Sequence, residues 1–155
     1  MNNISDHITY AEATKSQTAT RKNIKNIPNE EELANMKLLA EKCFEPLRNW
    51  LGKPIAITSF FRSARLNKAI GGSATSQHCK GQAMDIDADI FGGITNIEIF
   101  NWLRERVNFD QLIAEGWNEK TQDYKWVHVS YDPVRNRKQC LKAKFSNGKV
   151  SYGII

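Results

Sequence analysis

Cysteine is scarce in the 155-residue sequence, and its three positions, Cys43, Cys79 and Cys140, lie far apart. No two of them have the short CxxC spacing of zinc-finger or redox motifs, and an odd number leaves at least one thiol unpaired. A framework of disulfides is therefore not expected, and a reducing compartment during synthesis is the simplest inference.

The sequence also lacks segments that would target or anchor a protein. Residues 1–7 contain no basic region followed by an apolar run, so a secretory signal is not expected. No apolar stretch approaches the ~20 residues of a membrane-spanning helix, so membrane insertion is not expected. We therefore expect the protein to be cytoplasmic as synthesised, and to need delivery by other means if its substrate lies elsewhere.

The composition is that of an ordinary folded protein, with 41% hydrophobic and 25% charged residues. Its length suits one domain, residues 1–155, in which the polar residues 1–28 are expected to be less regular. The net charge of +5 favours a polyanionic partner: nucleic acid, an anionic membrane surface or an anionic cell wall. Nucleic acid is not expected, because the short basic cluster Arg135–Lys138 has no recognition-helix pattern beside it.

Apolar spacing predicts one long helix and several short ones. From Glu31 to Leu51 apolar residues recur at steps of three and four, and Pro46 is expected to kink or split this helix. A turn at Asn26–Asn29 precedes it. Further helices are predicted after Thr9, over Ala64–Ile70 and after Thr95.

Short apolar runs between these helices predict a small sheet. Gly116–Glu119 is expected to be a turn between two paired strands, and Ser146–Lys149 has a hairpin-type turn signal. We assign the sequence to the α+β class, with helices packed on a small antiparallel sheet. The expected strands are Ile55–Ser59, Ala83–Ile86, Phe109–Glu115, Tyr124–Tyr131 and Gln139–Phe145.

Three residues have the chemistry of a catalytic zinc site. His78 and Asp85 lie in one glycine-bounded stretch, and His128 lies in the apolar strand around Val127 and Val129. Two imidazoles and a carboxylate can hold zinc with a fourth position left for water. The competing interpretation is structural, because a lone histidine in a strand is more often not a ligand and Asp85 could cap a turn.

Several motifs together resemble a known family. They are SFFRS at Ser59–Ser63, SQH at Ser76–His78, GQAMDI at Gly81–Ile86 and WVHVSY at Trp126–Tyr131. In this order they resemble the M15 family of zinc D-Ala-D-Ala carboxypeptidases and murein endopeptidases, in its small single-domain branch common in phages and prophages. The resemblance extends from about Asp6 to Tyr131. Each motif alone is weak, whereas the combination is specific.

The resemblance implies a hedgehog/DD-peptidase-like fold and a set of site residues. His78, Asp85 and His128 would bind Zn²⁺. Arg62 would bind substrate and stabilise the oxyanion, which fits a guanidinium aimed at developing negative charge. Ser76 would line the site near the substrate.

The general base departs from the family pattern. Many relatives carry a glutamate three residues before the second histidine, where this sequence has Lys125, which is cationic at neutral pH. Glu115 is the best substitute if its strand pairs with the strand of His128, and it would accept the proton of the attacking water. Glu119 and Asp123 are the alternatives.

The resemblance thus implies a zinc-dependent peptidase that hydrolyses peptidoglycan stem peptides in cell lysis or wall remodelling. It leaves open a D-Ala-D-Ala carboxypeptidase and an endolysin-type endopeptidase. The alternative is a non-catalytic, zinc-containing wall-binding domain of the same fold, which Lys125 supports. A monomer is expected, acting on the cell wall after release through a phage lysis pore.

Overall fold

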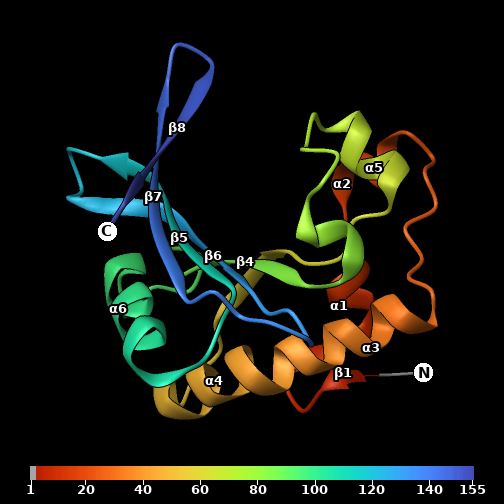
Figure 1. The fold of residues 1–155 in the computed structure, drawn as a ribbon, viewed down its shortest axis with the longest axis horizontal. Coiled ribbons are helices and arrows are strands. Elements are labelled where there is room, and N and C mark those ends of the chain that lie inside the picture. Colours follow the sequence, from red (N-terminus) through yellow and green to blue (C-terminus); the bar gives the residue numbers. More distant parts are fainter. Residues whose placement is uncertain (1–2) are drawn as a thin grey trace.

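The computed structural model describes residues 3–155 and has the predicted α+β class. Its main sheet has six strands in the order β3-β4-β6-β5-β7-β8 (Figure 1). The strands are β3 (Ala56–Ser59), β4 (Ala83–Asp87), β5 (Gln111–Asn118), β6 (Asp123–Ser130), β7 (Gln139–Ser146) and β8 (Lys149–Ile154).

Helices pack against this sheet, and a short two-stranded ribbon precedes them. The N-terminal segment, expected to be less regular, contains the ribbon β1 (Asn3–Ser5) and β2 (Ile8–Thr9) and the first two helices. The α-helices are α1 (Tyr10–Thr14), α2 (Gln17–Arg21), α3 (Glu30–Leu39), α4 (Glu45–Leu51), α5 (Ala64–Ala69) and α6 (Asn96–Arg106). A π-helical turn, η1 (Ala40–Phe44), and a 3-10 helix, η2 (Gln77–Lys80), complete the set.

The predicted long helix is α3, η1 and α4 in direct succession, which Figure 1 shows as one rod. Asn29 begins it with a capping box to Glu32. Pro46 lies in the first turn of α4, directly after the π-helical turn. Proline donates no backbone hydrogen bond, and its ring would clash with the preceding turn of an ordinary α-helix. The wider π-helical turn before Pro46 avoids that clash. Proline therefore divides the helix without ending it.

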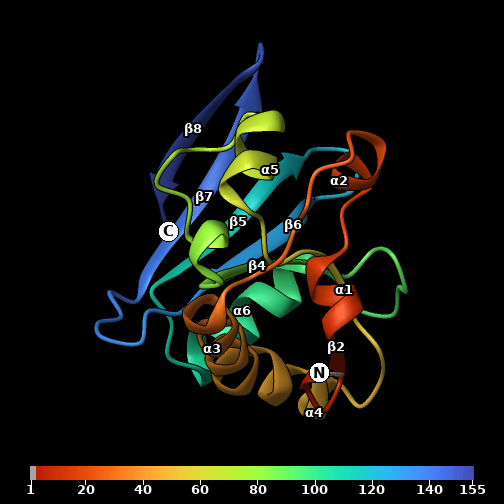
Figure 2. The ribbon, with the colours of Figure 1, turned by 90° about the vertical axis from the view of Figure 1, so that its right-hand side faces the viewer.

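The two faces of the sheet differ. Met84 and Ile86 of β4 are fully buried and belong to one hydrophobic core with Leu39 of α3 and Leu103 of α6, so these helices cover that core face. Strand alternation turns Asp85 to the other face, as predicted. Figure 2 shows α5 on this outer side, with the long helix and α6 on the other. Hydrophobic burial on one face thus leaves the other for polar chemistry.

One expectation for the sheet was wrong, and another holds for every strand pair of the main sheet but one. Gly116 is not in a turn, because β5 continues to Asn118 and the turn falls at residues 119–122. Gly116 adopts φ +73° within the strand, a conformation that glycine allows. Because glycine is also common in turns, its presence in the sequence suggested a turn here. The sheet is also not wholly antiparallel, since β7 pairs in parallel with β5.

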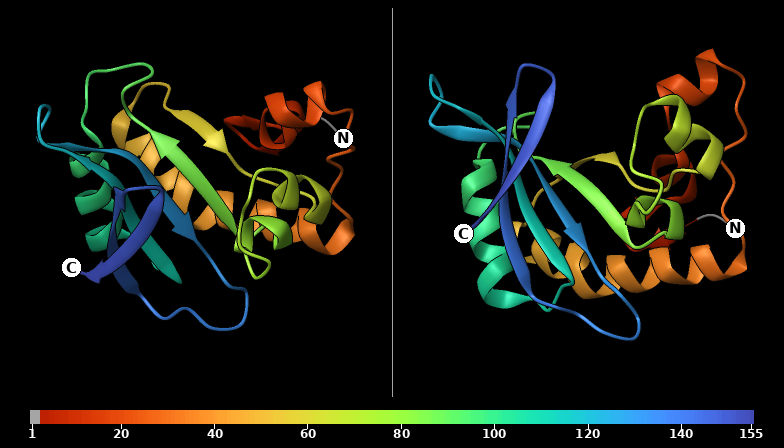
Figure 3. Two further views of the ribbon diagram at one scale, coloured as in Figure 1. Left: turned by 90° about the horizontal axis from the view of Figure 1, so that it is seen from above. Right: turned by 45° about the horizontal axis from the view of Figure 1, so that its top comes forward.

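The predicted turn between residues 146 and 149 joins β7 to β8. Asn147 and Gly148 both have positive φ, 51° and 75°, which is the backbone of a tight hairpin. The left view of Figure 3 places this hairpin and residues 3–21 on opposite sides of the molecule. Within residues 3–155, no helix is both long and apolar enough to cross a bilayer.

Candidate active site

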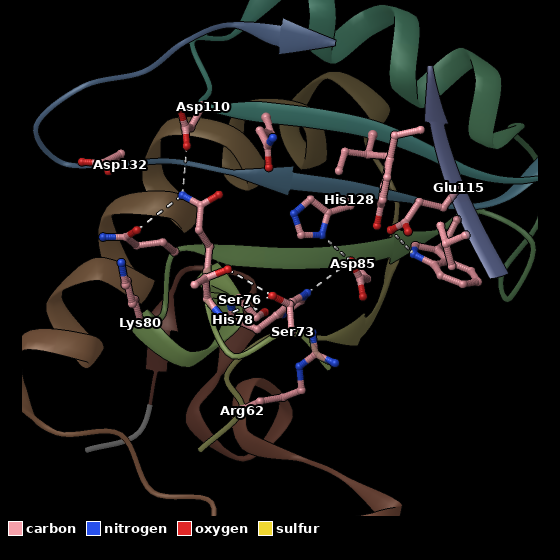
Figure 4. Close-up of a pocket in the computed structure, with 18 of the residues that line it drawn as sticks. Arg62, Ser73, Ser76, His78, Lys80, Asp85, Asp110, Glu115, His128 and Asp132 are labelled. Atoms are coloured by element: carbon pink, nitrogen blue, oxygen red, sulfur yellow. Dashed lines mark hydrogen bonds and ion pairs between the residues drawn. The ribbon is translucent and has the colours of Figure 1, made fainter. Parts of the chain in front are cut away.

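The structure brings His78, Asp85 and His128 together, with one ligand atom of each within 4.8 Å of the others. Nε2 of His78 is 3.4 Å from Oδ1 of Asp85, and Nδ1 of His128 is 3.0 Å from the same oxygen. The two imidazole centroids are 5.2 Å apart and their planes are inclined by 70°. We call these three residues the triad; Figure 4 shows Asp85 and His128 side by side on neighbouring strands, with His78 below them.

Strand register explains half of this arrangement. Asp85 of β4 is directly opposite His128 of β6, so both side chains lie on the same face of the sheet. Val127 and Val129 alternate with His128 and are fully buried in the core. Burial of the valines thus fixes the side on which the histidine points.

The turn at Gly81 explains how His78 reaches the same point. Gly81 ends η2 with φ +72°, and a Cβ atom there would collide with the carbonyl oxygen of Glu32 in α3. Only glycine fits this left-handed, tightly packed position. Ser76 begins η2 by accepting a hydrogen bond from the His78 backbone N–H at 3.2 Å. Serine and glycine together hold the histidine over β4.

The donor set fits a cation. Nδ1 of His78 lies 2.7 Å from the carbonyl oxygen of Phe60. That oxygen can only accept, so Nδ1 donates to it, and Nε2 is the nitrogen that points to Asp85 and would bind a cation. A histidine whose other ring nitrogen is held by a backbone carbonyl has the orientation typical of a metal ligand. Two histidines and a carboxylate are typical ligands of catalytic zinc.

The carboxylate is ready to bind a cation. Burial raises the pKa of the Asp85 carboxyl, but the charges and hydrogen bonds of His78 and His128 outweigh it and hold the pKa well below its usual range. Asp85 is therefore ionised across the neutral range.

The sequence model of the family described as Peptidase M15 matches residues 6–130, which include the whole triad. The chain belongs to the peptidase M15 family. A comparison with curated proteins gave no match. The chain is therefore an M15 metallopeptidase, whose family acts on peptides, and its triad is the plausible metal site.

The triad of this M15 peptidase lies in a cleft of about 1010 Å³ that Arg62 and Ser76 also line. The buried Nε of Arg62 has no hydrogen-bond partner within residues 3–155, so this nitrogen does not tie the guanidinium to another part of the fold. Ser76 faces the cleft while its hydroxyl caps η2. Their substrate roles stay predictions.

Glu115 lines the same cleft, in contrast to Lys125. Lys125 is an odd number of residues from His128, so strand alternation does not place it beside that histidine. Its ammonium lies 5.8 Å from the centroid of the Phe145 ring instead. Glu115 of β5 is directly opposite Trp126, on the face that also carries His128. Oε2 of Glu115 accepts a hydrogen bond from the Trp126 indole N–H at 2.7 Å.

The electrostatics of Glu115 suit proton transfer. Burial raises the pKa of its carboxyl, and the negative charge of Asp85 raises it further. His128, the Trp126 indole and Arg62 act in the opposite direction but less strongly. A raised pKa makes the carboxylate a better proton acceptor near neutral pH.

Neither alternative base lines the cleft. Glu119 is exposed in the β5–β6 turn, where it accepts a hydrogen bond from the Trp117 indole at 2.9 Å. Asp123 accepts hydrogen bonds from the backbone N–H groups of Asn96 and Ile97, so it stabilises the start of α6. Among the three carboxylates considered from the sequence, Glu115 alone faces the triad's cleft.

Sequence reasoning missed a polar cluster around the buried Asp110, beside the triad. Asp110 accepts hydrogen bonds from Nε and Nη2 of Arg137, both 2.8 Å long, and from the Gln77 amide at 3.1 Å. Gln77 directly precedes His78, so this cluster ties η2 to the loop before β7. In the sequence, Asp110 is a single aspartate after Phe109 and belongs to no recognisable motif, so nothing indicated this cluster.

Proposed function

We propose that this M15 peptidase hydrolyses peptide bonds in peptidoglycan stem peptides, with Zn²⁺ held by the triad. The observation that carries this is the convergence of three metal-ligand atoms within 4.8 Å, inside a cleft that Arg62 and Glu115 also line. The peptidoglycan substrate comes from the motif resemblance, and the net charge of +5 is compatible with an anionic wall.

Each site residue has a separate task in the proposed reaction. Zinc would supply Lewis acidity, which lowers the pKa of water and polarises a carbonyl. Glu115 accepts a proton from the attacking water and later donates it to the leaving amine. The guanidinium of Arg62 binds the carbonyl oxygen as negative charge develops there. The Trp126 indole keeps the Glu115 carboxylate oriented toward the cleft.

Zinc-dependent hydrolysis of purified murein tests this proposal. The protein loaded with zinc should release new amino groups, and His78→Ala should lose both zinc and activity. A matched control is His7→Ala, because His7 is exposed and contacts Glu45 rather than the triad. Release by His78→Ala equal to that of the unchanged protein would contradict the proposal.

The alternative is a wall-binding domain that keeps zinc without catalysis. Lys125 at the position of the usual base is the observation that favours it. Full zinc occupancy together with binding to murein and no release of amino groups would establish this alternative. The place of Glu115 in the cleft favours the peptidase.

A further inference from the structure

The cleft continues past the triad on two sides. Figure 4 shows Asp85 and His128 at its centre, with Lys80, Asp110 and Asp132 toward one end and Glu115 toward the other. We call the first end the polar arm, lined by Lys80, Asp110, Asp132, Arg135 and Arg137. We call the second end the aromatic arm, lined by Glu115, Trp126, Phe145, Val150 and Tyr152.

The aromatic arm is built mostly by the β7–β8 hairpin, beyond the segment that the family model matches. Phe145 and Val150 are opposite each other across the hairpin. The rings of Trp126 and Phe145 are 5.5 Å apart and inclined by 32°, so they form one continuous apolar surface. Tyr152 is 60% exposed. Partial burial raises the pKa of its phenol, and the nearby negative charge of Glu115 raises it further.

These side chains remain exposed although they are apolar. Phe145 is 40% exposed and Val150 48%, and both border the catalytic cleft. A cluster of exposed large apolar residues on a soluble protein marks a binding surface more often than a chance arrangement. Because this surface is continuous with the triad's cleft, its natural occupant is the peptide substrate itself.

The polar arm has the opposite character. Lys80, Arg135 and Arg137 are all exposed at the cleft margin, and Arg137 is also paired with Asp110. Ammonium and guanidinium groups in such a position bind carboxylates. The Asp132 side chain accepts hydrogen bonds from the backbone N–H groups of Val134 and Arg135. It therefore stabilises the loop that carries Arg135.

We propose that the enzyme cuts internal peptide bonds, with a carboxylate-bearing segment of the substrate in the polar arm and an apolar segment against the aromatic arm. This inference rests on the proposed function and chooses between its two modes of cleavage. A carboxypeptidase releases one terminal residue and needs a closed end beside the metal. A cleft that extends from the triad in two directions accommodates chain on both sides of the cut bond.

The first test removes the terminal carboxylate. The zinc-loaded protein is given a synthetic stem pentapeptide ending in D-Ala-D-Ala and the same peptide as its C-terminal amide. An internal cut predicts kcat/KM values within about threefold of each other, and mass spectrometry should show two multi-residue products. Release of a single D-Ala with a loss of about 100-fold or more on the amide would overturn the inference while leaving the proposed peptidase intact.

The second test addresses the hairpin. Tyr152→Ala and Phe145→Ala are each expected to raise KM for murein peptides about five- to tenfold, with kcat nearly unchanged, because they remove aromatic contacts made equally before and during reaction. Tyr152→Phe keeps the ring and should keep KM near its original value. Thermal unfolding of each variant checks that the hairpin still folds.

Ile154→Ala is the matched control, since Ile154 lies on the same strand, is 83% exposed and does not line the cleft. An unchanged KM in Tyr152→Ala and Phe145→Ala, or an equal rise in Ile154→Ala, would overturn the role of the aromatic arm. Absence of hydrolysis in the unchanged zinc-loaded protein would overturn the proposed function, and the inference with it.

Discussion

The indole nitrogen of Trp126 and the carboxylate of Glu115 are joined by a hydrogen bond of 2.7 Å across the β5–β6 pair. This bond holds a half-buried carboxylate on the same face of the sheet as His128. In the proposed mechanism, the neighbouring strand supplies the base in place of a glutamate three residues before that histidine.

Replacement of Glu115 by glutamine should separate metal binding from turnover. Glu115→Gln is expected to retain zinc, because Glu115 is not in the triad, and to lose about 10²–10⁴-fold in kcat. Metal analysis and amino-group release measure the two effects. Glu119→Gln is the control, since Glu119 is exposed and does not line the cleft. Undiminished turnover in Glu115→Gln would remove this residue from the mechanism.

Loss of the indole donor should shift the pH profile in a defined direction. The Trp126 hydrogen bond lowers the pKa of Glu115, so Trp126→Phe should raise that pKa further above its ordinary value. Since the base works ionised, the acid limb of kcat/KM then moves to higher pH. A pH–rate profile of both proteins checks this, and a shift to lower pH would contradict it.

Two glycines with similar backbone angles should respond differently to alanine. Gly52 has φ +71° with open space around a new Cβ, so Gly52→Ala should cost only the left-handed strain of about 1–2 kcal/mol. Gly81 has φ +72° and packs against Glu32, so overpacking should add about 1–3 kcal/mol. Denaturant unfolding compares the two, and Gly81→Ala should also weaken zinc binding because it displaces His78. Equal losses would contradict the packing argument.

The pair Asp110 and Arg137 should make stability depend on acid. The hydrogen bonds of Arg137 hold the pKa of Asp110 below its usual range, although burial opposes them. A depressed folded-state pKa stabilises the protein above the ordinary aspartate pKa, and this contribution is lost as pH falls through the folded-state value. Asp110→Asn should therefore lower the free energy of unfolding by about 1–3 kcal/mol at pH 7 and flatten its decline in acid. An unchanged acid dependence would contradict this.

Local signals in the sequence predicted much of the fold. Side-chain caps at Thr9 and Thr95 begin helices as expected, because a cap depends on residues within one turn. Apolar alternation around Asp85 and His128 predicted their common face. The approach of both residues to His78 was inferred from motif resemblance, and the structure confirms that approach.

Features set by distant residues could not be predicted. The parallel pairing of β5 with β7 depends on which edge of β5 is still free when β7 reaches the sheet. The alternation of apolar and polar residues within a strand shows which face is buried, but not which strand will be its neighbour. The partnership of Asp110 with Arg137 and Gln77 arises only when three segments meet. The aromatic arm was missed because Tyr152 follows no motif and reaches the cleft through the hairpin.

Parallel pairing of β7 also shields the sheet. Along Gln111–Glu115, β5 is paired with β6 on one side and with β7 on the other. A chain shortened after residue 130 would leave β5 as a bare edge, with unpaired N–H and C=O groups beside buried Leu112 and Ala114. Such an edge is a template for joining another copy, so the shortened chain would aggregate rather than act as a minimal enzyme.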